Sequence, residues 1–193
     1  MTHLGHSLPT PDAIAEWLPR QRWFAAKTRR IHRVTFADAV PLGAGVVLLA
    51  DVELDDGGGE RYALPIAAGE DIVDGLGDVE LARAVLALLA RAGAAAGDRG
   101  EIRGVPAAGL AERWPQGPPA DMALRRIGGE QSNTSVVLGD AFVLKHFRKL
   151  APGLNPEAEV TRFLTERTSF RNTPRLAGHL EYRDARGESR RWR

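Results

Sequence analysis

Residues 130–164 read EQSNTSVVLGDAFVLKHFRKLAPGLNPEAEVTRFL, and this stretch decides how the second half of the chain folds. Its two apolar runs are separated by Gly139–Asp140, a pair of residues typical of a tight hairpin turn. Asn155 then precedes a proline, which is a common way for a helix to begin. The stretch therefore predicts two paired strands followed by a helix over Pro156–Arg167.

The residues on either side extend this order. Met122–Ile127 reads as a strand, and Gly128–Ser135 reads as a polar turn that begins with glycine. After the helix, Arg175–Tyr182 reads as a further strand. The resulting order is strand, loop, strand, strand, helix, strand. This is the order of the small lobe of a kinase-like fold.

Two parts of this order are suited to holding nucleotide phosphates. A loop between paired strands can place backbone N–H groups and short polar side chains over phosphates. The donors that we select in this loop are Gln131, Ser132, Asn133 and Thr134. Lys145 lies inside an apolar strand, where a lysine that faces a cleft can pair with the α- and β-phosphates. Each part also has an ordinary alternative, namely a simple turn and a lysine exposed to solvent.

A helix carboxylate that pairs with the strand lysine would be the third part of the site. We prefer Glu159, which lies one turn into the predicted helix. Glu157 is the alternative, because it lies in the first turn, where the helix dipole favours any carboxylate. Strand alternation places His146 on the opposite face from Lys145, and we predict a structural role for it.

The first part of the chain predicts a small antiparallel sheet with helices. The strand-like runs are Ile31–Val40, Gly45–Leu54 and Arg61–Ala67. We predict one helix from about Ala13 to Ala25, with Asp12 as its N-cap and a break at Pro19. A second helix is predicted over Asp78–Ala92, with Asp78 as its N-cap and a break after it at Gly93–Gly100.

The composition of residues 115–119 (PQGPP) is that of a linker. We therefore place a cap domain at residues 1–114, a linker at residues 115–120 and an incomplete kinase-like small lobe at residues 121–193. The predicted fold class is α+β. It comprises a small antiparallel-sheet cap domain with helices and then a small lobe of antiparallel sheet plus one helix.

Composition and charge exclude several classes of function. The chain has 193 residues, is 44% hydrophobic and carries a net charge of +1, which gives no reason to expect nucleic acid or a membrane as partner. It has no cysteine, so it has no disulfide and no thiolate metal site. The first residues do not have the pattern of a signal peptide, and we expect a cytoplasmic protein.

Residues 130–164 resemble the start of the kinase core in bacterial maltokinases and in the maltokinase-like regions fused to some trehalose synthases. The segment WLPRQRWFAAKTRRI, residues 17–31, resembles the N-terminal cap region of the same family. These kinases are relatives of the aminoglycoside-phosphotransferase-like group. The resemblance implies ATP-dependent phosphorylation of maltose to maltose 1-phosphate, which feeds α-glucan synthesis. It also implies that residues 131–134 lie in the phosphate loop, that Lys145 holds phosphates and that Glu159 holds Lys145.

The catalytic Asp, a neighbouring Asn and the metal-binding Asp of this family come from a large C-terminal lobe. We expect that lobe to be absent from these 193 residues, because no histidine is followed two positions later by aspartate, as a His-x-Asp catalytic loop requires. We therefore assign no catalytic residue and no metal ligand here. Ligands for Mg²⁺ are expected only in the missing lobe, and we predict that the chain alone is inactive.

Two alternative functions stay open. The chain could belong to a related small-molecule phosphotransferase with another acceptor. It could also be a non-catalytic cap module that binds a partner, such as an enzyme of α-glucan or trehalose metabolism. ATP binding that depends on Lys145 would separate the kinase interpretation from the cap module.

Overall fold

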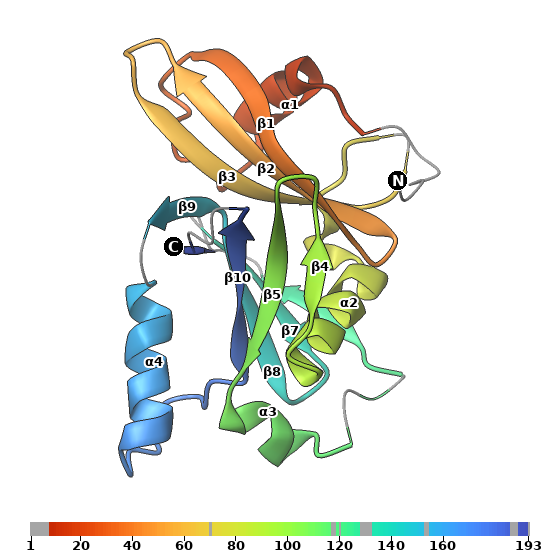
Figure 1. Ribbon diagram of the computed structural model, residues 1–193, viewed down its shortest axis with the longest axis vertical. Helices are drawn as coiled ribbons and strands as arrows, with labels where there is room; N and C mark the ends of the chain where they lie inside the picture. The colour runs from red at the N-terminus through yellow and green to blue at the C-terminus, as the bar shows by residue number, and fades with distance from the viewer. Residues whose placement is uncertain are drawn as a thin grey trace.

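The structure is a computed structural model that describes residues 8–69, 71–116, 119, 121–127, 133–152, 155–185 and 189–192. It has an α+β fold in which short helices pack on antiparallel sheets (Figure 1). The predicted fold class is therefore confirmed.

The first sheet region is a meander of three long strands. They are β1 (Ile31–Leu42), β2 (Gly45–Leu54) and β3 (Gly59–Ile66). All three predicted strands are confirmed, and the predicted bounds of β2 are those observed. The antiparallel register pairs Val47 with Val40 on one side and with Pro65 on the other.

The first helix is shorter than the sequence predicts. Helix α1 covers Pro11–Trp17, and a 3₁₀ turn, η1 (Leu18–Arg20), follows it with Pro19 in its first turn. The predicted cap, Asp12, is wrong: the N-cap is Thr10, whose hydroxyl accepts a hydrogen bond from the Ala13 amide at 3.2 Å. Asp12 lies inside the first turn of α1, where its negative charge interacts favourably with the helix dipole.

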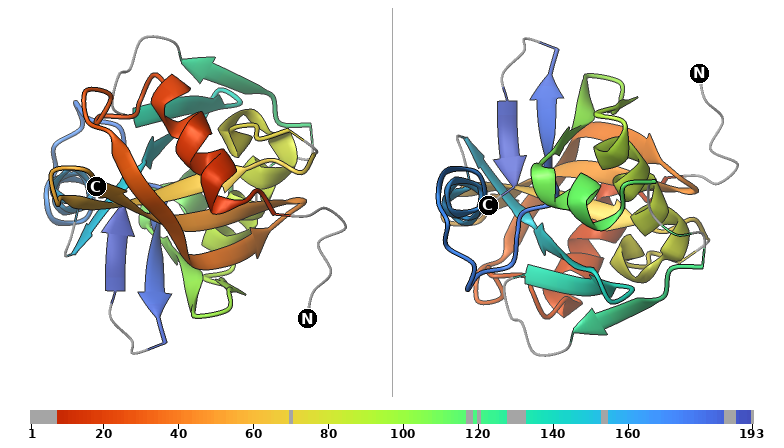
Figure 2. Two further views of the ribbon diagram at one scale, coloured as in Figure 1. Left: turned by 90° about the horizontal axis from the view of Figure 1, so that it is seen from above. Right: turned by 90° about the horizontal axis from the view of Figure 1, so that it is seen from below.

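Side-chain alternation along β2 divides the interior into two cores. Leu48 and Ala50 lie in the core that α1 covers, together with the aromatic ring of Phe24. Val47 and Leu49 lie in the other core, under helix α2 (Val79–Ala90). Because successive strand residues point to opposite faces, the two helices cover opposite faces of the same strands (Figure 2).

Helix α2 begins where the sequence predicts. The carboxylate of Asp78 accepts a hydrogen bond from the Leu81 amide at 2.9 Å and is the N-cap. The 3₁₀ turn η2 (Gly75–Gly77) precedes the helix. The region after it, predicted only as a break, contains strand β4 (Ala94–Ala96), which pairs with β5 (Gly100–Pro106). Helix α3 (Ala108–Arg113) then closes this part of the chain.

The second half follows the predicted order. Its elements are β6 (Leu124–Ile127), β7 (Asn133–Leu138), β8 (Phe142–Phe147), β9 (Lys149–Pro152), α4 (Pro156–Arg167), β10 (Gly178–Asp184) and β11 (Ser189–Trp192). The bounds of α4 are those predicted, and the side-chain oxygen of Asn155, Oδ1, caps the helix by accepting a hydrogen bond from the Glu157 amide at 2.8 Å. Strand β9 was not predicted.

Strands from both halves share one sheet. Its order is β1-β2-β3-β9-β11-β10-β5-β4, while β6-β7-β8 form a second, three-stranded sheet. Pairing of β3 with β9 and of β5 with β10 joins residues on the two sides of the predicted linker at 115–120. The division into domains at this linker stays a prediction from sequence, and the large sheet is continuous across it.

A close approach between α2 and β5 requires glycine at position 104. A Cβ atom there would lie 2.3 Å from the Leu88 carbonyl oxygen, so the backbones would have to separate. We expect Gly104→Ala to lower the free energy of unfolding by about 2 kcal/mol in urea titrations. Gly59→Ala is the control, because a Cβ atom at Gly59 meets no atom within 4 Å. Equal stability of the two variants would contradict this account of the packing.

Candidate functional site

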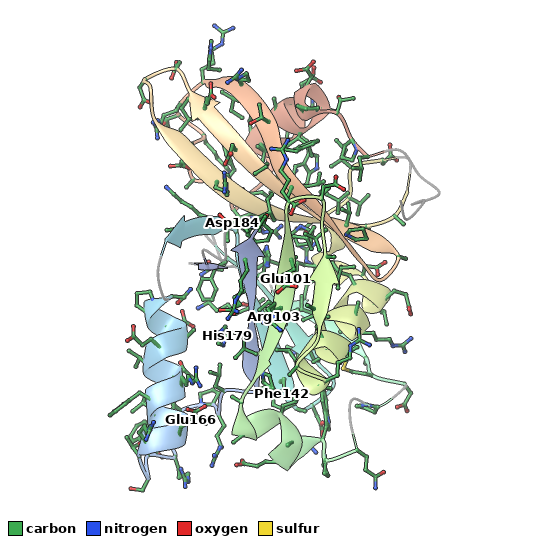
Figure 3. All side chains as sticks on the ribbon, viewed as in Figure 1. Glu101, Arg103, Phe142, Glu166, His179 and Asp184 are labelled. Atoms are coloured by element: carbon green, nitrogen blue, oxygen red, sulfur yellow. The ribbon has the colours of Figure 1, made fainter. Side chains whose placement is uncertain are left out.

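A cleft of about 1370 Å³ lies between α4 and the strands of both sheets. Phe142 on β8, His179 on β10 and Glu166 on α4 line it and are labelled in Figure 3. The cleft also receives Lys145 from β8 and Glu157 from α4. It is the place where the predicted lysine and the predicted helix meet.

Lys145 is held at the cleft by a carboxylate and an aromatic ring. Its Nζ donates to both carboxylate oxygens of Glu157, each at 2.9 Å. The same Nζ lies 5.2 Å from the ring centroid of Phe147, two residues further along the strand. The side chains of Lys145 and Glu157 are 31% and 53% exposed. The ammonium group is therefore oriented while it remains accessible from the cleft.

The preference for Glu159 as the partner of Lys145 is wrong. The structure pairs Lys145 with Glu157, the alternative, and Glu159 is exposed. Residues two positions apart on a helix point about 200° apart around its axis, so only one of them can face β8. The packing of α4 turns Glu157, the second residue of the helix, toward the lysine.

The described end of the predicted phosphate loop lies at the start of β7, and its residues Asn133, Thr134 and Ser135 do not line the cleft. Gln131 and Ser132 lie outside the described residues. Asn133 and Thr134 are not in a loop but begin β7, which shortens the predicted loop at its C-terminal end. In the β7–β8 register, Ser135 lies opposite Lys145. The end of the loop segment and the lysine are therefore neighbours across one pair of strands.

Residues 17–97 match the family model of the maltokinase N-terminal cap domain. This part of the chain is therefore similar to a maltokinase N-terminal cap domain. It spans β1, β2, β3, α2 and β4. The match covers less than half of the 193 residues and does not include Lys145 or Glu157. The predicted maltokinase resemblance is confirmed for the cap domain, and the nucleotide-binding roles stay predictions.

The cap domain contacts the strand that carries Lys145. His146 points away from the cleft lysine, as predicted, and its Nε2 lies 3.1 Å from the backbone oxygen of Ala63 on β3. Because a carbonyl oxygen only accepts, the imidazole donates this hydrogen bond. Burial lowers the pKa of His146 to about 3, and the nearby charge of Arg148 acts in the same direction. His146 is therefore neutral and joins β8 to the cap domain.

A neutral, partly buried His146 makes stability depend on pH. Between its folded pKa of about 3 and its ordinary value of 6.5, the unfolded chain binds a proton that the folded chain does not. We expect the free energy of unfolding to fall by about 1 kcal/mol from pH 7 to pH 5.5. His146→Gln, whose amide can still donate to Ala63, should lose this part of the dependence in urea titrations. An unchanged pH profile in this variant would contradict the assignment.

Among the residues that the structure describes, no three His, Cys, Asp or Glu side chains gather in a way that could hold a metal ion. Within the same residues, no helix is long and apolar enough to cross a membrane.

Sequence reasoning missed two charged residues near the site. Arg148 is almost fully buried, with 1% of its surface exposed, and it contacts Asp74 of the cap domain. The one signal in the sequence was a pair of basic residues, Arg148–Lys149, directly after an apolar strand.

Proposed function

We propose that this chain carries the nucleotide-binding half of a maltokinase-like sugar kinase. In this proposal the loop segment 128–135 and Lys145 hold the phosphates of ATP, and Glu157 orients Lys145. The complete protein would transfer the terminal phosphate of ATP to maltose, which gives maltose 1-phosphate and ADP. The cap-domain match supports the family, and the resemblance of residues 130–164 supports the acceptor.

The observation that carries the proposal is the two-oxygen contact between Lys145 and Glu157 at the cleft. A carboxylate that accepts hydrogen bonds from one ammonium group through both of its oxygens fixes the direction of that group. A strand lysine free in solvent has no such fixed direction. Fixed direction matters for phosphate, because positioning and electrostatic stabilisation provide most of the catalysis in phosphoryl transfer. The pair would orient ATP without taking part in bond making.

The groups that perform the transfer are not assigned to this chain. Mg²⁺ supplies charge neutralisation on the phosphates when it is bound. The described residues offer no three-ligand cluster for it, so we propose that its ligands and the base for the sugar hydroxyl belong to a further lobe. On this proposal the chain by itself binds ATP and does not phosphorylate maltose.

The cellular role follows from the same proposal. Maltose 1-phosphate is an activated sugar, and we propose that it feeds α-glucan and trehalose metabolism in the cytoplasm. An enzyme of these pathways would be a natural partner. A related phosphotransferase with another acceptor would have the same nucleotide-binding half, because this half does not recognise the acceptor.

Nuclear magnetic resonance of the ¹⁵N-labelled chain tests the proposal. Addition of MgATP should shift the amide signals of Lys145, Glu157 and Ser135 in a saturable way. Adenosine lacks the phosphates and should leave the Lys145 signal in place.

A cap module without nucleotide affinity is the second candidate, and the cap-domain match is the observation that favours it. It predicts no shifts near Lys145 with either compound. Shifts confined to residues of the cap domain would also contradict the kinase proposal.

A further inference from the structure

A second pocket, of about 600 Å³, lies in the cap domain and is separate from the cleft that receives Lys145. One wall is α1 with η1, and the other is formed by the β1–β2 turn and by the end of β3 with the residues that follow it. We call it the cap pocket, and its lining includes Glu16, Trp17, Arg20, Val46 and Ile66. Within the described part of the chain, no residue lines both the cap pocket and the cleft. Figure 1 shows α1 and α4 at opposite ends of the molecule.

Helical spacing turns one aromatic and two charged side chains toward the cap pocket. Arg20 follows Glu16 by four residues and Trp17 by three, so the three side chains share one face of α1 and η1. Ile14 and Leu18 lie on the opposite face, have no exposed surface and belong to the core. The helix therefore packs through one face and presents the other to the pocket.

The two charged side chains of this face are available to a ligand. Glu16 and Arg20 are exposed, and among the described residues neither of them takes part in an ion pair. Asp71 is the other charged residue of the described lining, so the pocket has two carboxylates against one guanidinium. A lining with this balance does not favour a phosphate or another anion.

Trp17 gives the cap pocket an apolar surface that is held in place. Its ring is half-buried and lies 5.8 Å from the ring of Trp23, at an interplanar angle of 62°. Gln21 Nε2 donates a hydrogen bond to the Trp17 backbone oxygen at 3.2 Å. Val46 and Ile66 add apolar surface from β2 and β3. An oriented aromatic ring beside a carboxylate and a guanidinium suits a neutral ligand that has an apolar face and an edge of hydroxyl groups.

We infer that the cap pocket binds a neutral saccharide of one or two hexose units. The C–H face of a pyranose ring packs on Trp17, while Glu16 accepts hydrogen bonds from the sugar hydroxyls and Arg20 donates to them. The volume of the pocket lies in the range of about 300–1,000 Å³ that is common for small-molecule sites. This inference does not rest on the proposed function. The pocket is also separate from the maltose acceptor site, which we propose lies in a further lobe.

Titration of the ¹⁵N-labelled chain with maltose, followed by NMR, tests the inference. We expect saturable shifts of the Trp17 indole N–H signal and of the Ala13 and Val46 amide signals, with a dissociation constant of about 1 mM. Sorbitol has hydroxyl groups but no pyranose face and should leave these signals in place. The inference is overturned if maltose shifts none of them, if its shifts are confined to the cleft around Lys145, or if sorbitol reproduces them.

Variants at the cap pocket separate its two kinds of contact. Trp17→Ala should weaken maltose binding about tenfold, whereas Trp17→Tyr keeps an aromatic face and should bind within about threefold of the unaltered chain. Glu16→Gln changes an exposed side chain and should weaken binding about threefold, because a charged acceptor is lost. Glu80→Gln is the control, since this exposed glutamate lies on α2 and outside the pocket, and it should bind normally.

MgATP affinity of the same proteins shows whether a loss is local. We expect it to be equal in the unaltered chain and in all four variants, because the cleft and the cap pocket have no lining residue in common. If Trp17→Ala also disturbs the fold, as its thermal unfolding would show, Glu16→Gln decides the outcome. Undiminished maltose binding in Glu16→Gln and in a folded Trp17→Ala would overturn the inference. Maltose binding by an unaltered chain that binds no MgATP would uphold the cap pocket and reject the proposed function.

Discussion

On the proposed function, we expect Lys145→Met to weaken MgATP binding about 30-fold and to leave the unfolding temperature nearly unchanged. The affinity should fall because a charge-assisted bond to phosphate contributes about 2 kcal/mol. The stability changes little because the Lys145–Glu157 pair is partly exposed, and such pairs contribute little to folding. Calorimetric titration gives the affinity, and thermal unfolding followed by circular dichroism gives the stability.

The two glutamates of α4 supply a matched comparison for this prediction. Glu157→Gln should weaken MgATP binding about fivefold, because Lys145 loses the carboxylate that orients it. Glu159→Gln, two residues away on the same helix, should bind as the unaltered chain does. A larger loss for Glu159→Gln than for Glu157→Gln would show that the observed ion pair is not the one that serves the nucleotide.

Replacing Asp38 by alanine should destabilise the protein by about 4 kcal/mol, the largest effect on stability that we expect. Asp38 is buried on β1. Its Oδ1 accepts from the amides of Ala39 and Asp98 at 2.8 Å and of Arg99 at 3.2 Å. Its Oδ2 accepts from the Tyr182 hydroxyl of β10 at 2.9 Å. Asp38→Ala removes the carboxylate that accepts from all four donors, and urea titration measures the resulting fall in the free energy of unfolding.

Smaller changes at the same contact separate its parts. Tyr182→Phe removes one bond and should cost about 1 kcal/mol, since the other three donors keep the carboxylate. This hydrogen bond joins Asp38 in the cap domain to Tyr182 in the second half of the chain, and both lie in one continuous sheet. We therefore expect each variant to unfold in a single transition. Two separate transitions, with Asp38→Ala affecting only the first, would contradict the continuous sheet.

Local signals in the sequence predicted the elements well. Asn155 followed by Pro156 predicted α4 with its observed bounds, and Asp78 predicted the start of α2. Both are caps, whose physical cause lies within three or four residues of chain. The turn at Gly139 was also predictable from local sequence, because glycine adopts the observed φ of 58° at little cost in free energy.

Contacts between distant segments were not predicted. Strand β9 pairs with β3 through only two residue pairs, one of them Tyr62 with Lys149, and no pattern in either segment specifies the other. The same holds for Asp74 and Arg148, which are 74 positions apart. Such contacts depend on the whole fold, so the sequence revealed the parts of the small lobe but not how the cap domain joins it.

At the candidate site, one feature was predicted from the sequence and another was not. Lys145 and its helix were predicted from residue order, and the structure brings them together at the cleft. The choice between Glu157 and Glu159 depended on how the helix is rotated against β8, a tertiary property. Propensity and capping fix where a helix starts, but packing fixes which face turns toward the strand.

Calorimetric titration of MgATP into the unaltered chain is the measurement that tests the central claim most directly. The account predicts saturable binding of one nucleotide per chain, with a dissociation constant between about 10 μM and 1 mM. No binding by a chain that unfolds cooperatively would contradict it. The cap domain would then be the only part of this chain with a supported assignment.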